Sequence, residues 1–544
     1  MYLIQILITC VLWTLLTSVN CKVVLSREKI SEILNSIDSI KTRVTIDNYE
    51  HTTTGLPKIN NKLTKTKVSY NDIDIEDNKT KNNITFKSKS KVTQTNETEH
   101  LEPLILTPLI EQGRIDEARN ASVVNPELFL NVTSYSGYLT VNKTYNSNMF
   151  FWYFPIADKP ICESPWIIWL QGGPGASSMT GLFDEIGPIK MDAKLNLERN
   201  PYTWLQNHSL LFFDNPVGAG FSFTDDKRGY VRDMPTYSSQ LYTAFHQFVQ
   251  LFPELKEAPL YIAGESYAGK YVPTLGLEIH KRIHLPEHRV NLKGLMIGNA
   301  YVDPAVIPRT VRPFYNFGLI EQEQVEMLKP MSKAVAEQVA ANNGTLAKQK
   351  WMNLVALLLM MSHQSQAYNF LQNELGVGKY VKFLNRIDVQ KAIHTRRLNF
   401  NFVNMTVNSN LAPDFLSSSK PHFETLLEHY RVLAYCGQLD LMMPCVTTSE
   451  NYRTWKWNET EKFINATRLP YLYQYKRAGY HKTGGGLTEV VFIGAGHMVP
   501  MDVPAPARDL ITKWTHNKKL SISLPLLEGS YISRFIANNT AAYL

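Results

Sequence analysis

Three segments that lie far apart in the sequence carry the residue types of a nucleophilic triad. They are LYIAGESYAGKY with Ser266, GQLDLMMP with Asp440 and GAGHMVP with His497. A serine nucleophile on a sharp strand-to-helix turn needs very small residues two positions before and two positions after it, because larger side chains would collide with the neighbouring backbone. Gly264 and Ala268 satisfy this need. The motif alone is weak evidence, since an ordinary strand-to-helix turn can carry the same residues.

The order of the three residues along the chain strengthens the interpretation. Asp440 and His497 each follow a predicted buried strand, so both lie on loops at strand carboxyl ends, as Ser266 does. Serine, then aspartate, then histidine is the order found in α/β-hydrolases. In that arrangement His497 accepts the serine proton, while Asp440 holds the imidazole tautomer and stabilises its charged form. Asp502 is a rival acid, but it lies only five residues after His497 and is expected to cap a turn.

An oxyanion hole is predicted in WLQGGPGASSM. Gly172 and Gly173 directly follow a predicted buried strand and can expose their amide N–H groups. Acyl transfer needs one such donor, assigned to Gly173, together with the N–H of the residue after the nucleophile, Tyr267. GGPG could instead be a phosphate-binding turn. No lysine follows at the P-loop spacing and no GxGxxG is present, which argues against a nucleotide site.

The elements that position these residues are predicted from short apolar runs that end in glycine or polar turns. Six runs indicate buried parallel strands, at 166–170, 209–213, 260–263, 294–297, 432–435 and 490–493. Stretches at 237–251 and 271–283 are long enough to be crossover helices. From about 306 to 428 the alternation stops and helices dominate, including 322–342 and 351–375. The pattern predicts a doubly wound α/β sheet with an inserted helical cap over the strand carboxyl ends.

The ends of the chain and its composition favour a secreted globular protein. Of 544 residues, 44% are apolar and 19% charged, and the net charge of +7 comes from scattered basic residues, so nucleic acid is a poor candidate partner. Residues 3–19 lack charge and predict a signal peptide, 1–21, although a signal anchor is the alternative. The polar stretch 22–100 is interpreted as a pro-segment or tail, with a helix possible over 26–40. The catalytic domain would occupy 101–544, with no other transmembrane anchor.

Sequons and cysteines fit the same compartment. Asn-x-Ser/Thr begins at Asn78, Asn83, Asn96, Asn120, Asn131, Asn142, Asn207, Asn343, Asn404, Asn458, Asn465 and Asn538. Twelve sequons predict several glycans in a secreted protein. Removal of the leader leaves Cys162, Cys436 and Cys445, an odd number that excludes a disulfide framework and leaves at least one thiol free or paired elsewhere.

Seven segments together resemble the serine carboxypeptidases, in particular their insect vitellogenic and venom branch. They are SGYLTVN, WLQGGPGASS, DNPVGAGFSF, GESYAGKYVP, IGNAYVDP, GQLDLMMP and GAGHMVP, in order from about Leu104 to the C-terminus. The resemblance implies an α/β-hydrolase fold with a helical cap, and removal of residues from peptide or protein C-termini without a metal or cofactor. It also implies a secreted or lysosomal location, and it allows a homodimer.

The resemblance also implies roles for further residues. Positions that hold the substrate's terminal carboxylate are matched by Gln171, Gly172, Glu185 and Glu265. Thr180 and Met498 match pocket-lining positions. Asp184 stands where the family is usually apolar, so it either alters which terminal or penultimate side chain is accepted or is a solvated helix residue. Most relatives have cysteine in place of Ala176, although the nearer branch lacks it, and the family's usual disulfides cannot form from three cysteines.

Two other classes of function remain open at this point. An acyltransferase or esterase could use the same triad, because fold and triad do not specify the acyl acceptor. The two glutamates argue against it, since an ester substrate has no free carboxylate to recognise. A catalytically silent storage or venom protein is the third class, but silent homologues usually lose a triad member and this chain keeps all three. Two glutamates in one pocket further predict peptide binding that is best at acidic pH.

Overall fold

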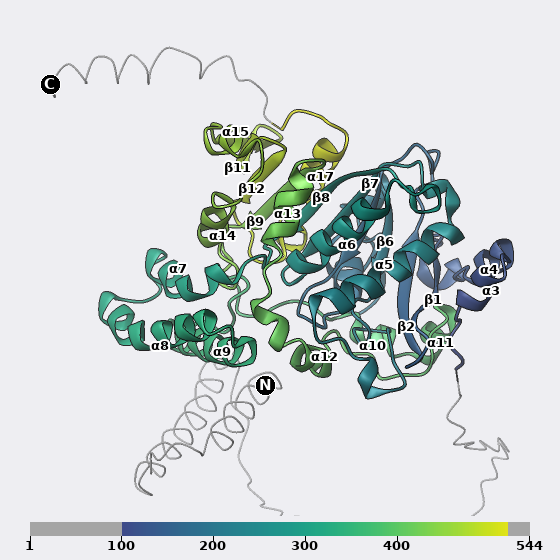
Figure 1. Cartoon of the computed structure of the whole chain (residues 1–544), viewed down its shortest axis with the longest axis horizontal. Coiled ribbons are helices and arrows are strands. Elements are labelled where there is room, and N and C mark those ends of the chain that lie inside the picture. Colours follow the sequence, from purple (N-terminus) through teal and green to yellow (C-terminus); the bar gives the residue numbers. More distant parts are fainter. Residues whose placement is uncertain (1–100, 521–544) are drawn as a thin grey trace, which may run out of the picture. The chain divides into compact units, whose positions relative to one another are not determined.

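The computed structural model describes residues 101–520 (Figure 1). The predicted signal peptide, the polar stretch 22–100 with its possible helix, and four of the sequons lie outside the described residues. No helix within 101–520 is both long and apolar enough to cross a membrane.

A ten-stranded mixed sheet forms the centre of the described chain, in the order β1-β2-β6-β3-β7-β8-β9-β12-β11-β10. All six predicted strands are present, and they are the six neighbouring parallel strands from β6 to β12. Their continuous apolar runs arise because both faces of the sheet are covered. The strands are β1 Tyr135–Asn142, β2 Ser147–Phe154, β3 Trp166–Leu170, β6 Ser209–Phe213, β7 Leu260–Glu265, β8 Leu292–Gly298, β9 Arg431–Gly437, β10 Leu469–Tyr473, β11 Lys476–Gly484 and β12 Leu487–Phe492, with β4 Ile189–Met191 and β5 Leu197–Arg199 as a separate pair.

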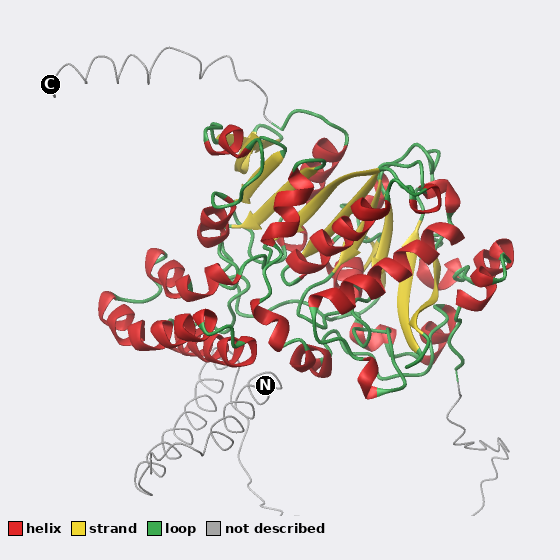
Figure 2. Cartoon of the chain, viewed as in Figure 1, coloured by secondary structure: helices red, strands yellow, loops and turns green. Residues whose placement is uncertain are grey.

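Helices cover both faces of the sheet (Figure 2). The long crossover helices α5, Met234–Leu251, and α6, Ala268–Arg282, pack on one face, where their apolar sides join one core cluster. Helix α17, Pro504–Thr515, belongs to the second cluster on the opposite face. The remaining helices of the sheet region are α3 Thr107–Glu111, α4 Ile115–Ala121, η1 Pro126–Phe129, η2 Gly181–Glu185, η3 Trp204–Gln206, η4 Lys227–Gly229, η5 Pro253–Leu255, η6 Pro286–His288, α14 Cys445–Tyr452, α15 Thr460–Ile464 and α16 Val499–Asp502.

Between β8 and β9 the chain is mainly helical (Figure 1). The elements are η7 Pro304–Arg309, α7 Val311–Asn316, α8 Gln322–Ala340, α9 Gly344–Met361, α10 Val381–Leu384, α11 Ile387–Ala392, α12 Met405–Asn410, η8 Pro413–Leu416 and α13 Lys420–Leu427. We refer to residues 304–427 as the helical insertion. Helices α8 and α9 pack against each other within it.

The predicted helix over 351–375 is wrong at both ends. Helix α9 begins earlier because the Asn343 side chain caps it, accepting a hydrogen bond from the Leu346 N–H at 3.1 Å. It ends at Met361 because His363 adopts a left-handed φ of 53°. The residues after it form turns that approach the candidate site.

Candidate active site

The nucleophile candidate lies on a strained turn between β7 and α6. Ser266 has a left-handed φ of 61° and is partly exposed. A Cβ added to Gly264 would lie 2.6 Å from the Leu170 carbonyl oxygen and 2.7 Å from the Ala268 Cβ. These contacts leave no room for a side chain at Gly264 or for a larger one at Ala268, as the motif predicts. The Ser266 N–H donates to the Gly298 carbonyl at 3.0 Å, which fixes the turn against β8.

Asp440 and His497 form a buried pair at the same edge of the sheet. The His497 Nδ1 and Asp440 Oδ2 atoms are 2.7 Å apart, and the exposed fractions of the two side chains are 2% and 0%. Asp440 Oδ1 accepts hydrogen bonds from the Met442 and Met443 N–H groups at 2.7 and 3.2 Å. His497 Nε2 is buried and has no hydrogen-bond partner among the described residues. The imidazole is thus oriented by a carboxylate at one nitrogen and is open at the other, the arrangement that a general base requires.

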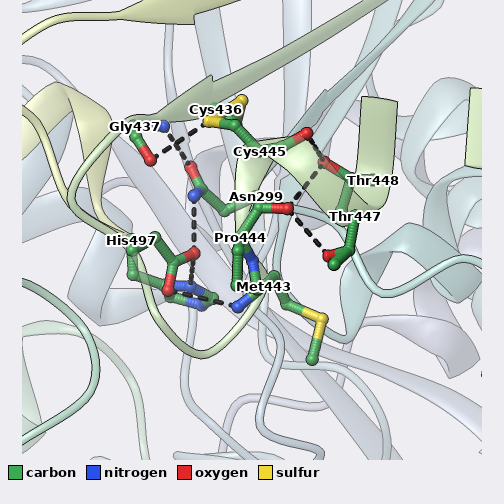
Figure 3. The surroundings of a disulfide bond; sticks show 10 residues. Asn299, Cys436, Gly437, Met443, Pro444, Cys445, Thr447, Thr448 and His497 are labelled. Carbon is green, nitrogen blue, oxygen red and sulfur yellow. Dashed lines mark hydrogen bonds and ion pairs between the residues drawn. A yellow bond between two sulfur atoms is a disulfide. The ribbon is translucent and has the colours of Figure 1, made fainter. Parts of the chain in front are cut away.

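Asn299 is a further member of this site that the sequence interpretation missed (Figure 3). Its Nδ2 donates to Asp440 Oδ2 at 2.6 Å, and its Oδ1 accepts from the Gly437 N–H at 3.1 Å. The residue directly follows β8 and has a left-handed φ of 40°. A polar residue immediately after a predicted strand, at the edge that carries the triad candidates, was the available signal.

A disulfide joins Cys436 and Cys445 on either side of the Asp440 loop (Figure 3). Cys436 is in β9 and Cys445 begins α14. Cys162 is free and exposed. A free Cys162 is one of the two outcomes that the odd cysteine count allowed, and the pair that forms closes the loop carrying the acid.

Asp502 contacts the backbone of the His497 loop rather than the imidazole. Its Oδ2 accepts hydrogen bonds from the Gly496 N–H at 2.7 Å and from Asn369 Nδ2 at 3.0 Å. The helical insertion also contacts His497 directly, because the Tyr368 carbonyl accepts the His497 N–H at 2.6 Å. The Tyr368 ring packs edge-on against the imidazole, with centroids 4.9 Å apart. Asp502 and Tyr368 therefore hold the loop from two sides.

The glycine-rich segment after β3 lies against the nucleophile turn. A Cβ on Gly172 would be 2.5 Å from the Tyr267 nitrogen and 2.8 Å from the Ser266 Cβ. Gly173 has a φ of 105°, a conformation that favours glycine. Buried Asp214 holds the next residues, since its carboxylate accepts hydrogen bonds from Ser177 Oγ at 2.7 Å and the Ser178 N–H at 2.8 Å.

The side chain of Tyr267 is anchored in the helical insertion. Its hydroxyl donates to Asp414 Oδ2 at 2.8 Å. Lys270 Nζ donates to the Asp414 and Phe415 carbonyl oxygens at 2.6 and 3.0 Å and lies 4.7 Å from the Tyr267 ring centre. Burial lowers the pKa of Lys270 to about 8. Lys270 Nζ also lies 3.6 Å from Asp414 Oδ2, so a buried ion pair fixes the residue whose N–H is the candidate oxyanion donor.

Two glutamates and a glutamine meet beside the triad candidates. Gln171 Nε2 donates to Glu265 Oε1 at 3.1 Å and approaches Glu185 Oε1 at 3.4 Å, while its own Oε1 accepts from Trp169 Nε1. Both glutamates are buried, and their Oε1 atoms have Gln171 Nε2 as a common neighbour. Burial raises the pKa of Glu185 to about 7, and burial together with the charge of Glu185 raises that of Glu265 well above its usual range. Burial of two neighbouring carboxyls therefore disfavours the state in which both are ionised.

The three predicted pocket residues have distinct surroundings. Thr180 Oγ1 is 2.7 Å from the Tyr380 hydroxyl of the helical insertion, and Met498 is buried next to His497. Asp184 Oδ2 accepts the Gly378 N–H at 3.0 Å, and burial raises the pKa of Asp184 to about 7. Asp184 is only partly exposed, because the helical insertion contacts it through Gly378.

The sequence profile of the serine carboxypeptidase family matches residues 125–517. The chain belongs to the serine carboxypeptidase family. It is 39% identical to venom serine carboxypeptidase of Apis mellifera over 434 residues, which covers 76% of this chain and 91% of the relative. It is 37% identical to vitellogenic carboxypeptidase of Aedes aegypti over 439 residues, which covers 77% of this chain and 91% of that protein.

Among solved structures, the chain is similar to Kex1, a prohormone-processing carboxypeptidase from Saccharomyces cerevisiae. The TM-score is 0.67 at 23% identity, covering 73% of this chain and 96% of Kex1. The similarity confirms the predicted α/β-hydrolase fold. Together with the family match, the relatives confirm that this serine carboxypeptidase is a hydrolase of the exopeptidase class.

Proposed function

We propose that Ser266, His497 and Asp440 are the catalytic triad, which releases the C-terminal residue of a peptide through an acyl-enzyme. The observation that carries the assignment is the buried contact between His497 Nδ1 and Asp440 Oδ2 at 2.7 Å, which leaves Nε2 unpaired. Gly173 and Tyr267 supply the oxyanion N–H donors. The packing of Gly172 supports this assignment of donors. There is no room for a Cβ at Gly172, so the segment that carries Gly173 lies directly against the nucleophile turn.

The chemistry follows from these roles. Ser266 Oγ attacks the last peptide carbonyl as its proton passes to His497 Nε2, and the two N–H groups stabilise the resulting oxyanion. The carbon–nitrogen bond then breaks as His497 returns the proton to the departing amino group. Water, deprotonated by His497, attacks the acyl-enzyme and frees Ser266. Asp440 stays ionised throughout and stabilises the imidazolium.

We also propose that Gln171, Gly172, Glu185 and Glu265 recognise the terminal carboxylate of the substrate. An ionised pair of glutamates would repel a carboxylate, whereas a protonated glutamate can donate a hydrogen bond to it. The raised pKa values support a pair that keeps a proton in mildly acidic solution. The competent form is populated below the raised pKa and is lost as pH rises through it, so peptide binding is favoured at acidic pH.

Asp184, Thr180 and Met498 are proposed to line the pocket for substrate side chains. Asp184 is next to Glu185, and burial raises its pKa to about 7. It is therefore neutral in acid and negatively charged above neutrality. A preference for a basic substrate side chain would grow as pH rises and would disappear in Asp184→Asn.

A secretory location is proposed from the leader, the sequons and the disulfide. Among the sequon asparagines that the structure describes, Asn120, Asn131, Asn343, Asn458 and Asn465 are exposed, whereas Asn142, Asn207 and Asn404 are partly buried. Asn404 is the least suited to a glycan, because its Nδ2 donates to the Gly218 carbonyl at 2.8 Å.

The triad is tested by substitution. Ser266→Ala and His497→Ala should each lower the turnover of a blocked dipeptide by several orders of magnitude, because triad members act as a unit. Ser266→Ala should also abolish labelling by a fluorophosphonate probe, with an unchanged melting temperature. Near-normal turnover by the Ser266→Ala protein would reject this nucleophile. Labelling without dipeptide cleavage would indicate an esterase, and absence of both would indicate a silent protein.

A further inference from the structure

Four neighbouring strands end in a row of residues that crosses the carboxylate site. In the register of the sheet, Leu170 pairs with Gly264, so Gln171 comes next to Glu265. Glu265 pairs with Gly298 of β8, and Gly298 pairs with Tyr435 of β9. Residues in register on parallel strands share a face of the sheet. Gln171, Glu265 and Tyr435 therefore lie on one face, with a glycine between the last two.

The phenol of Tyr435 occupies the space above that glycine. A Cβ on Gly298 would lie 2.6, 2.7 and 2.8 Å from Cε2, Cζ and the hydroxyl oxygen of Tyr435. The ring therefore extends across β8 in the direction of β7, the strand that carries Glu265. Gly298 permits this because any side chain there would displace the ring.

The Tyr435 hydroxyl is buried, and it has no hydrogen-bond partner among the described residues. The Oε2 atoms of Glu185 and Glu265 likewise receive no hydrogen bond from a donor in the described part of the chain. A buried hydroxyl without a partner is costly, and a carboxylate oxygen can accept more than one hydrogen bond. Besides burial, the charges of Glu265 and Glu185 raise the pKa of the phenol.

We propose that Tyr435 is a positioning residue of the terminal-carboxylate site, whose hydroxyl donates a hydrogen bond through one water molecule to the Glu265 carboxyl and so fixes the shared proton of the two glutamates. This inference rests on the proposed role of Glu185 and Glu265. In this role Tyr435 acts through Glu265 and not by contact with the substrate or the reacting atoms. Burial and the two glutamates hold the pKa of Tyr435 well above its usual range, so the hydroxyl remains a donor wherever the enzyme is active.

Other titratable groups surround the glutamates and must stay unchanged in a test. From the elements packed against the pair they are Asp184, Tyr368, Tyr380, Asp440, His497 and Asp502. Tyr435→Phe removes one hydroxyl and leaves all of them in place. A donor to a carboxyl favours its ionised form, so removing the donor raises the apparent pKa of the pair. The protonated form then persists to higher pH.

The test is the pH dependence of KM for a blocked dipeptide. We expect Tyr435→Phe to move the midpoint of the KM rise upward by about half to one pH unit, with kcat in acid changed less than about twofold. Tyr153→Phe is the matched control, a buried tyrosine on the other face of the sheet whose charged neighbours are Glu254 and Arg119, and it should leave the midpoint in place.

Glu265→Gln, alone and combined with Tyr435→Phe, shows whether Tyr435 acts through Glu265. Once Glu265 is neutral, adding Tyr435→Phe should cause no further shift. A midpoint that is unchanged or lowered by Tyr435→Phe, in an enzyme whose KM does rise with pH, overturns the role of Tyr435 alone. If KM of the unmodified enzyme does not rise with pH, the carboxylate site itself is wrong. A loss of thermal stability without a change of midpoint would assign Tyr435 to packing and would also overturn the inference.

Discussion

At the scale of single residues, the chemistry of the triad could be predicted from sequence because each member has a local signature. Ser266 has small neighbours, and Asp440 and His497 each follow an apolar run. Asn299 also directly follows an apolar run, that of β8, but nothing in the neighbouring sequence marks it as a partner of Asp440. Its importance depends on the 2.6 Å hydrogen bond to Asp440, which joins the ends of the neighbouring strands β8 and β9. That contact can be recognised only when the pairing of the two strands is known.

We predict that Asn299→Ala lowers kcat about ten- to a hundredfold, because a buried hydrogen bond to a charged group contributes about 1.5–3 kcal/mol. The effect should exceed any change in KM, since Asn299 contacts Asp440 and not the proposed carboxylate site. Steady-state kinetics measure both constants. Asn299→Asp, nearly identical in shape, should be at least as damaging because it places a second carboxylate beside Asp440. An Asn299→Ala enzyme with unaltered kcat would exclude this role.

At the scale of secondary-structure elements, the six parallel strands were predicted, whereas β2, which is buried along its whole length, was not. Each of these six strands contains a continuous apolar run because helices cover both faces of the sheet. The outer strands were not predicted as strands. β11, with the sequence KRAGYHKTG, is polar and partly exposed, so its pairing with β12 depends on tertiary contacts that its sequence does not express.

The Asp440 loop gives a prediction at the same scale. The disulfide between Cys436 and Cys445 spans a sequence separation of 9. Closing such a loop restricts the unfolded chain and stabilises a protein by roughly 2–4 kcal/mol. Replacing both cysteines by alanine should lower the melting temperature by several degrees and reduce kcat, because the loop that presents Asp440 is released. Cys162→Ala, which removes the free exposed thiol, is the matched control. Equal melting temperatures for the two variants would contradict this account.

At the scale of the whole molecule, the boundary near residue 100 was predicted from a change in composition. The polar stretch 22–100 offers little apolar surface to a core. We expect a protein that starts near His100, behind a heterologous signal peptide, to fold and to cleave a blocked dipeptide with kcat/KM within a few-fold of the full chain. Secretion yield and kcat/KM of the two proteins provide the comparison. Persistent aggregation or inactivity would show that the segment assists folding.

The end of helix α9 could not be predicted from the sequence. Its apolar pattern was extended past Met361, yet the chain turns there so that Tyr368 and Asn369 can reach the His497 loop. That turn serves contacts between segments more than a hundred residues apart. Hydrophobic periodicity carries no information about such contacts.

The central claim is that a protonated pair of buried glutamates recognises the substrate's free C-terminus next to the triad. The most direct measurement is KM of a blocked dipeptide, and of the same dipeptide as its C-terminal amide, from about pH 4 to pH 8 with one enzyme preparation. Burial raises the pKa of Glu185 to about 7 and the pKa of Glu265 well above its usual range, so the pair loses its shared proton as pH rises through neutrality. We predict that KM of the free acid is low in acid and rises steeply toward alkaline pH, while KM of the amide does not follow that rise. A KM for the free acid that stays level across the range, or rises in parallel with that of the amide, would contradict the claim.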